Sequence, residues 1–189
     1  MEKLIKKINK IPKNYFSLAD IRKISGLNDA SLKVALSRLV KNKGLIKISD
    51  SLYALPDAII KWEEAAIASY RPSYLSFEWI LAKYNILSQQ PASLTLATLR
   101  RSKKLETCQN PMIYRHLQKS LFWGYEQKDK ILAAYPEKAL IDLAYLSLNG
   151  YAKFDPEEMN LKLLNKNRIK QYLRKINNKK LTNLVNAIL

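Results

Sequence analysis

The feature that most constrains this chain is a pair of helical segments separated by a four-residue break. The first segment, "SLADIRKI", begins with Ser17 as a helix N-cap, and Asp20 stands where its side chain can reach back to that cap. The break, "SGLN", contains Gly26, which can adopt the left-handed conformation that ends a helix at little steric cost. The pattern predicts two short helices joined by a tight turn.

The second helical segment has one apolar and one polar face. Asn28 or Asp29 caps it, and Gly44 stops it after about Lys43. Its apolar positions recur at helical spacing and predict a buried stripe of Leu32, Leu36, Leu39 and Val40. The opposite face combines hydroxyl and cationic side chains without the Glu that a solubilising face usually contains.

The flanking segments complete a compact motif. "MEKLIKKINKI" predicts an amphipathic helix that ends before Pro12, and "LIKISDSLYAL" predicts two short strands around "SDS". A helix, a helix-turn-helix pair and a two-stranded ribbon make a winged helix-turn-helix, which we expect as a domain over residues 1–55. Its predicted core is Leu18, Ile21, Ile24, Leu32, Leu36, Leu39, Leu45, Ile46 and Tyr53.

Such a motif predicts double-stranded DNA, in the form of an operator, as a partner. The second helix of a helix-turn-helix lies in the major groove with its N-terminal residues near base edges. This geometry assigns base reading to Asn28, Ala30, Ser31, Val34 and Ser37. Contacts to phosphates from the helix and the wing are assigned to Lys33, Arg38, Lys41, Lys47, Ser49 and Ser51. One alternative is a helix face that is merely solvated, and another is a wing fold that contacts only protein.

The distribution of charge also favours a polyanionic partner. The chain carries 33 Lys and Arg against 16 Asp and Glu, a net charge of +17. Residues 1–55 contain 12 basic and 4 acidic side chains, whereas residues 160–189 contain 8 basic and no acidic ones. The second positive surface consists of Lys162, Lys166, Arg168, Lys170, Arg174, Lys175, Lys179 and Lys180. The alternative for this tail is a helical bundle with a solvated Lys-rich face.

Residues 56–189 predict a second, mixed α/β domain, so the expected class of the whole chain is α+β. Asp57 is a predicted cap for a linking helix over residues 58–69, and Ser76 is a predicted cap for another short helix. Strands are expected in "SLTLATL", "PMIYRHL" and "SLFWGYE", which are rich in β-branched or aromatic residues.

The remainder of this domain predicts mainly helices. "ILAAYPEKALIDLAYLSLNG" predicts a strand and then a helix with Pro136 in its first turn. "DPEEMNLKLL" predicts a helix capped by Asp155 and opens a basic helical tail over residues 156–189. Two more helices are expected at about 166–176 and 178–188.

The sequence contains no recognisable catalytic, cofactor-binding or metal-binding pattern. His116 is the only histidine, and Cys108 has no adjacent histidine that could activate it. The four glycines are scattered and form no phosphate-binding loop. Two adjacent acid pairs diverge in direction on a helix and are interpreted as solvated first-turn acids: Glu63 with Glu64, and Glu157 with Glu158. We therefore expect no enzymatic activity, no cofactor and no metal.

Several further properties predict a cytoplasmic protein. The single cysteine rules out an internal disulfide and fits a reducing compartment. The N-terminus lacks the apolar run of a secretory signal, and no segment approaches the ~18 uncharged apolar residues of a membrane span. We expect no membrane contact, and the oligomeric state stays open.

The second domain resembles the antitoxin domain of the AbiEi-type family. The resemblance lies in four ordered blocks behind the predicted winged helix: "SYRPSYLSFEWILAKYNIL", "SLTLATLRRS", "MIYRHL…LFWGYE" and "AAYPEKALIDLAYL". It covers most of the chain to about residue 150 and weakens in the basic tail. Members of this family are the antitoxins of bacterial abortive-infection toxin–antitoxin systems.

The resemblance implies a function with two parts. Such a protein represses its own operon through the winged helix and neutralises a cognate nucleotidyltransferase-like toxin through the second domain. Trp62, Tyr74 and Trp79 are candidate partner contacts, with burial in the domain core as the alternative. A stand-alone winged-helix transcriptional regulator, whose second domain senses a ligand or sets the oligomeric state, is the competing reading. A third possible function is that of a nucleic-acid-processing enzyme, but the missing catalytic residues argue against it.

Overall fold

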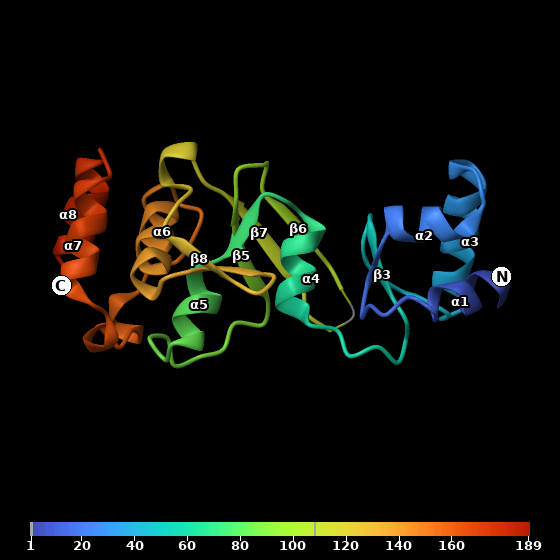
Figure 1. The fold of residues 1–189 in the computed structure, drawn as a ribbon. Helices are drawn as coiled ribbons and strands as arrows, with labels where there is room; N and C mark the ends of the chain where they lie inside the picture. The colour runs from blue at the N-terminus through green and yellow to red at the C-terminus, as the bar shows by residue number, and fades with distance from the viewer. Residues whose placement is uncertain (1, 108) are drawn as a thin grey trace. The chain divides into compact units, whose positions relative to one another are not determined.

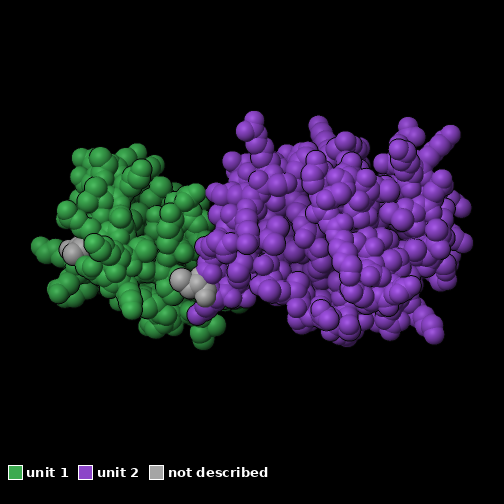
Figure 2. Space-filling view, turned by 180° about the vertical axis from the view of Figure 1, so that it is seen from behind, with its two compact units in different colours: residues 1–69 green, residues 70–189 purple. Residues whose placement is uncertain are grey.

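The computed structural model describes residues 2–107 and 109–189, and the chain divides into two compact units between Ser69 and Tyr70 (Figure 2). Helices and two β-sheets make up the described chain, so the predicted α+β class is confirmed. We call residues 1–69 the first unit and residues 70–189 the second unit. The sequence placed a boundary after residue 55, whereas α4 (Trp62–Ser69) packs with the strands of the first unit.

Three helices open the first unit (Figure 1). They are α1 (Glu2–Ile8), α2 (Leu18–Ser25) and α3 (Asp29–Lys41). The helix α2 contacts both α1 and α3, and the apolar faces meet in one core. That core consists of Leu4, Ile8, Phe16, Ile21, Leu32, Leu36, Leu39, Leu45 and Tyr53. Three members of the predicted core are only partly buried: Leu18, Ile24 and Ile46.

A small antiparallel sheet completes this core. Its strands are β1 (Phe16–Ser17), β2 (Ile46–Ser49) and β3 (Leu52–Ala54), in the order β1-β3-β2. The two strands predicted around "SDS" are therefore confirmed. A register shift between Lys47 and Ser49 interrupts the pairing of β2 with β3, as expected of a bulge. Ile48 and Ser49 are consequently both buried, although they are neighbours on one strand.

The segment between β3 and α4 forms a turn instead of the expected helix start. The Ala58 N–H donates to the Leu55 carbonyl at 3.2 Å, and helical bonding begins only at the Lys61 carbonyl, which accepts from the Ala65 N–H. The predicted start at residue 58, with Asp57 as its cap, is therefore wrong. The interpretation of Glu64 as a solvated acid is also wrong, because Glu64 is buried and pairs with Lys61 at 3.3 Å.

The second unit is built on a mixed six-stranded sheet. Its strand order is β6-β7-β5-β4-β9-β8, with parallel pairing of β5 with β7 and of β4 with β9. The strands are β4 (Ser73–Leu75), β5 (Leu94–Thr98), β6 (Lys103–Leu105), β7 (Met112–His116), β8 (Tyr125–Lys128) and β9 (Ile131–Ala134). The sequence predicted β5, β7 and β9 but missed β4 and β6.

Helices cover this sheet and then one another. The helices are α5 (Phe77–Lys83), α6 (Pro136–Leu148), α7 (Lys166–Arg174) and α8 (Lys179–Asn186). α5 and α6 pack together and contact β5 and β9 respectively, while α7 and α8 both contact α6 (Figure 1). Pro136 lies in the first turn of α6 as predicted, and the two predicted C-terminal helices are confirmed.

Two predicted elements of the second unit are different in the structure. "SLFWGYE" is a 3₁₀ turn (Lys119–Leu121) followed by the start of β8, because Gly124 has a φ of 75° that interrupts an extended strand. "DPEEMNLKLL" contains two 3₁₀ turns (Pro156–Glu158 and Leu161–Leu163) where a helix was expected. Between these turns, the Asn160 N–H donates to the Ile86 carbonyl at 2.8 Å, and this contact holds the segment against another loop.

Candidate nucleic-acid interface

Both ends of α2 are fixed by residues that the sequence predicted. The Ser17 hydroxyl accepts from the Asp20 N–H, and the Asp20 carboxylate accepts from the Ser17 N–H, which is a complete capping box. A hydrogen bond from Lys13, followed by those from Ser17, lowers the pKa of Asp20 to about 2. Gly26 ends α2 with a φ of 69°, a left-handed conformation. The capping box therefore fixes the start of α2, and Gly26 turns the chain out of α2 ahead of α3.

One face of α3 anchors the helix to the core. Leu32, Leu36 and Leu39 recur at offsets of four and three and are almost completely buried. Val40 lies beside this stripe and is partly buried. Because this face is fixed in the core, the opposite side of the helix points to solvent.

That outward face carries the residues predicted to read bases. All of them are exposed, and Val34 keeps 50% of its surface accessible. They are Asn28, Ala30, Ser31, Val34 and Ser37. The amide oxygen of Asn28 caps α3 by accepting from the Ser31 N–H at 2.9 Å, so only its NH₂ group is left for another partner.

The cations predicted to contact phosphates flank this face. Lys33, Arg38 and Lys41 are exposed on α3, and none of them forms an ion pair with a residue that the structure describes. At the turn between β2 and β3, Lys47 pairs with Asp50 at 3.0 Å in an exposed position. An exposed pair of this kind contributes little to stability, so Lys47 can exchange Asp50 for a phosphate at small cost.

Ser49 does not belong to this surface. It is only 5% exposed, and its hydroxyl accepts from the Ser51 N–H at 3.4 Å. Its assignment as a phosphate contact is therefore wrong, because the bulge in β2 turns the side chain inward. Ser51, at the turn itself, is exposed.

A groove of about 610 Å³ runs between α3 and this turn. Lys33 and Ser37 of α3 line one wall, and Lys47 and Asp50 line the other. Arg22 of α2 also lines the groove and pairs with Asp29 at 2.9 Å. The sequence analysis did not assign Arg22 a role, because its position in the groove depends on how α2 crosses α3. The groove lies between α3 and the turn that joins β2 and β3, and its lining contains three cations and two carboxylates.

The predicted second basic surface is smaller than the sequence suggested. Arg168 pairs with buried Glu137 at 3.3 Å and lies over the Tyr135 ring at 4.8 Å, so it is a packing residue. Lys166 donates to the Leu189 carbonyl, and Lys175 lies 5.7 Å from the Trp123 ring. Five further cations are exposed, and none of them forms an ion pair among residues 2–107 and 109–189: Lys162, Lys170, Arg174, Lys179 and Lys180.

A buried ionic network in the second unit escaped the sequence analysis. Lys138 and Asp142 lie one turn apart on α6, are both fully buried and form an ion pair. The Tyr74 and Ser76 hydroxyls donate to the Asp142 carboxylate at 2.9 and 2.8 Å. Burial raises the pKa of Asp142 and lowers that of Lys138. Two opposite charges at i and i+4 within the apolar run "EKALIDLAYL" were the signal for this pair.

The same network changes the roles predicted for several residues. Ser76 precedes α5 as expected, but its hydroxyl makes no cap bond because it donates to Asp142. Tyr74 is completely buried and cannot contact a partner, while Trp62 and Trp79 are partly buried. For Tyr74, burial in the domain core is therefore confirmed, and a partner contact is excluded.

The structure describes some, but not all, of the residues considered for chemistry. His116 is exposed at the end of β7, with Nδ1 3.1 Å from the Arg100 carbonyl oxygen. Cys108 lies outside the described residues. Within 2–107 and 109–189, no three His, Cys, Asp or Glu side chains form a group that could hold a metal ion. No helix in this part of the chain is both long and apolar enough to cross a membrane.

No family model matches this chain, and no curated protein matches it. The AbiEi-type resemblance therefore rests on the four sequence blocks alone. The geometry of the first unit and the charge of both units stand independently of that resemblance.

Proposed function

We propose that the first unit is a winged helix-turn-helix domain that binds double-stranded DNA. Its α3 enters the major groove, and the turn between β2 and β3 is the wing. The observation that carries this proposal is the outward face of α3, where small hydroxyl and apolar side chains are exposed between unpaired cations. A face built for solubility alone contains acids that pair with its cations, and this one has only Asp29, at its N-terminal end.

The residues of this surface divide into two kinds of contact. Ser31, Val34 and Ser37 are short, so they allow close approach to base edges, and Val34 offers a methyl contact to thymine. Arg38 and Lys41 are long and cationic and bind phosphates. Lys33 and Lys47 both line the groove, where one strand of the DNA backbone would lie between helix and wing.

We further propose that the whole chain is the antitoxin of a bacterial toxin–antitoxin system. In this proposal, the second unit neutralises a nucleotidyltransferase-like toxin, and the first unit represses the operon of the pair. The sequence resemblance supports the antitoxin role. The exposed cations of the tail support an acidic partner surface on the toxin or a second contact with DNA.

Selection of binding sites from a random duplex library tests the DNA proposal. We expect Ser31→Ala and Val34→Ala to alter the selected bases, because these side chains face them. Arg38→Ala should weaken binding to every sequence and reduce the salt slope by about 0.9. Lys130→Ala, an exposed cation of the second unit, is the matched control. Equal weakening on all sequences by the three α3 variants would remove the base-reading role.

The competing function is a stand-alone transcriptional regulator whose second unit senses a ligand or sets the oligomeric state. Co-expression with the product of the adjacent open reading frame separates the two functions. Restored growth and co-purification support the antitoxin. A neighbour that is harmless, or that the full chain neither binds nor relieves, favours the regulator.

A further inference from the structure

A pocket of about 730 Å³ opens in the second unit, beside the edge of its sheet. Its walls come from β6, from β7 and from the C-terminal end of α6 with the turn that follows. This volume is within the range of sites that hold small ligands. None of the residues assigned above to DNA or to the tail lines it.

Strand pairing determines which side chains of β6 and β7 face the pocket together. Lys104 lies opposite Ile113 in the antiparallel pair, so the two side chains point to the same face of the sheet. Arg115 lies two residues beyond Ile113 on β7 and shares that face. A lysine and an arginine are thereby brought to one wall.

Each of these two cations has one acidic neighbour and keeps donors that its neighbour does not use. Arg115 donates to both carboxylate oxygens of Glu78, at 2.7 and 2.8 Å, and both bonds come from Nη1. Its Nε and Nη2 hydrogens are not used by these bonds. Lys104 pairs with Glu106 at 2.7 Å, but both side chains are exposed, so that pair is weak. Among the described residues that line the pocket, none is an Asp or a Glu.

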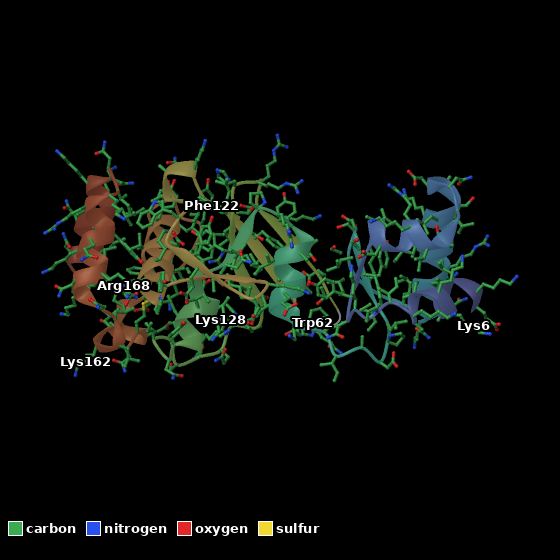
Figure 3. The ribbon with its side chains drawn as sticks, in the orientation of Figure 1. Lys6, Trp62, Phe122, Lys128, Lys162 and Arg168 are labelled. Carbon is green, nitrogen blue, oxygen red and sulfur yellow. The ribbon has the colours of Figure 1, made fainter. Side chains whose placement is uncertain are left out.

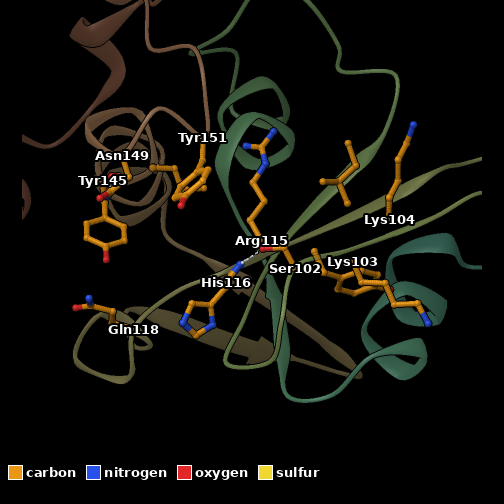
Figure 4. Close-up of a pocket in the computed structure, with 12 residues that line it drawn as sticks. Ser102, Lys103, Lys104, Arg115, His116, Gln118, Tyr145, Asn149 and Tyr151 are labelled. Carbon is orange, nitrogen blue, oxygen red and sulfur yellow. Dashed lines mark hydrogen bonds between the residues drawn. The ribbon is translucent and has the colours of Figure 1, made fainter.

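Aromatic and amide side chains form the other wall. Figure 4 shows Tyr145, Asn149, Tyr151 and Gln118 on one side, and Lys103 and Lys104 on the other. Gly150 has a φ of 73° and turns the chain after α6, so that Tyr151 returns toward the pocket. Tyr151 is 76% exposed, an unusual state for a tyrosine ring beside a pocket.

We propose that this pocket binds a nucleotide unit, consisting of one base and its phosphate. The base stacks on the Tyr151 ring beside Tyr145, and stacking of this kind tolerates any base. Gln118 and Asn149 line the pocket and supply amide groups for the edge of the base, although one N–H of Asn149 already donates to the Tyr145 carbonyl at 2.9 Å. The phosphate is held by Lys104 and by the unused donors of Arg115. A free mononucleotide and one nucleotide of a single strand share this chemistry.

Calorimetric titration of the full chain tests the proposal, with adenosine monophosphate and a single-stranded hexamer of adenylate as the two probes. Adenosine and inorganic phosphate, added separately, measure the two halves of the site. We expect Tyr151→Ala and Lys104→Glu each to weaken binding of the preferred probe roughly tenfold. Tyr84→Ala and Lys128→Glu, which alter exposed residues outside the pocket, are the matched controls and should leave binding unchanged.

Tighter binding of the monophosphate identifies a free nucleotide as the ligand, whereas tighter binding of the hexamer identifies a single strand. Absence of saturable binding of either probe up to roughly 1 mM would overturn the proposal. Binding that survives both pocket variants would also overturn it, since the probe would then bind outside this pocket. Selection of duplex sites is expected to be the same for Tyr151→Ala as for the unaltered chain. The pocket and the DNA proposal can therefore fail separately.

Discussion

Removal of either charge from the buried pair Lys138–Asp142 should destabilise the second unit strongly and unequally. In Asp142→Leu, the Lys138 ammonium stays buried with only the Tyr74 hydroxyl at 3.2 Å and two aromatic rings nearby. In Lys138→Met, the Asp142 carboxylate keeps the hydrogen bonds from Tyr74 and Ser76. Asp142→Leu therefore leaves a buried charge with weaker hydrogen bonding than the charge that Lys138→Met leaves.

The expected magnitudes follow from this difference. Breaking a buried ion pair by removing one partner costs about 3–5 kcal/mol, and we place Asp142→Leu at the upper end and Lys138→Met at the lower end. The double variant leaves no buried charge, but it removes the acceptor of the Tyr74 and Ser76 hydroxyls, which costs about 1–3 kcal/mol for each orphaned group. The unfolding free energy that the double variant loses should be smaller than the summed losses of the two single variants, by about 2 kcal/mol or more.

Urea unfolding followed by tryptophan fluorescence measures these values, because Trp123 lies beside Lys138 in the second unit. Ser147→Ala, a substitution near the end of the same helix, is a control for loss of a local hydrogen bond. Two results would refute the reasoning: a loss below about 1 kcal/mol for Asp142→Leu, or a double variant that loses the full sum of the single variants.

Three further predictions concern single residues. Because the pKa of Asp20 is lowered from 3.8 to about 2 in the folded state, the stability that Asp20 contributes is present above about pH 4 and is lost as the pH falls toward 2. Asp20→Asn should remove about 1 kcal/mol of this pH-dependent stability, which acid unfolding of both forms measures. Gly124→Ala should destabilise the second unit by about 1–3 kcal/mol in urea, because the φ of Gly124 is 75° and the new Cβ would lie 2.9 Å from Lys138 Cγ. An unchanged midpoint of urea unfolding would contradict this close contact. Asn28→Ala should cost the first unit about 1 kcal/mol in thermal unfolding, and Asn28→Asp, which keeps the cap, should cost less.

The helices of the first unit could be predicted because their signals are local. Ser17, Gly26 and Asn28 determine helix ends through bonds to residues within a few positions, and these are readable in sequence. The stripe of α3 follows from helical periodicity alone. Asp57 was misread because a cap residue predicts a helix only where the following backbone is helical, and here it forms a turn.

Errors in the second unit come from contacts between distant residues. The Ser76 hydroxyl could cap α5, but Asp142 lies 66 residues away in sequence and accepts its hydrogen bond. The strands β4 and β6 are only three residues long, and their strand character comes from neighbours in the sheet. Tyr74 was a candidate surface residue for the same reason, since nothing local places it on a central strand.

The candidate interface was predicted best where it depends on one helix. The exposure of Ser31, Val34 and Arg38 follows from the burial of the opposite face of α3. Ser49 was assigned wrongly because a bulge breaks the alternation of β2, and a bulge cannot be read from so short a strand. Arg168 was counted as a surface cation because its partner Glu137 lies on another helix.

The central claim is that the outward face of α3 contacts duplex DNA. Titration of the full chain with a selected duplex, followed through backbone amide NMR shifts, measures this directly. The account predicts that the largest shifts occur in residues 28–41 and 47–51, and that they disappear at high salt. Shifts that spare these segments and fall in the second unit would contradict it.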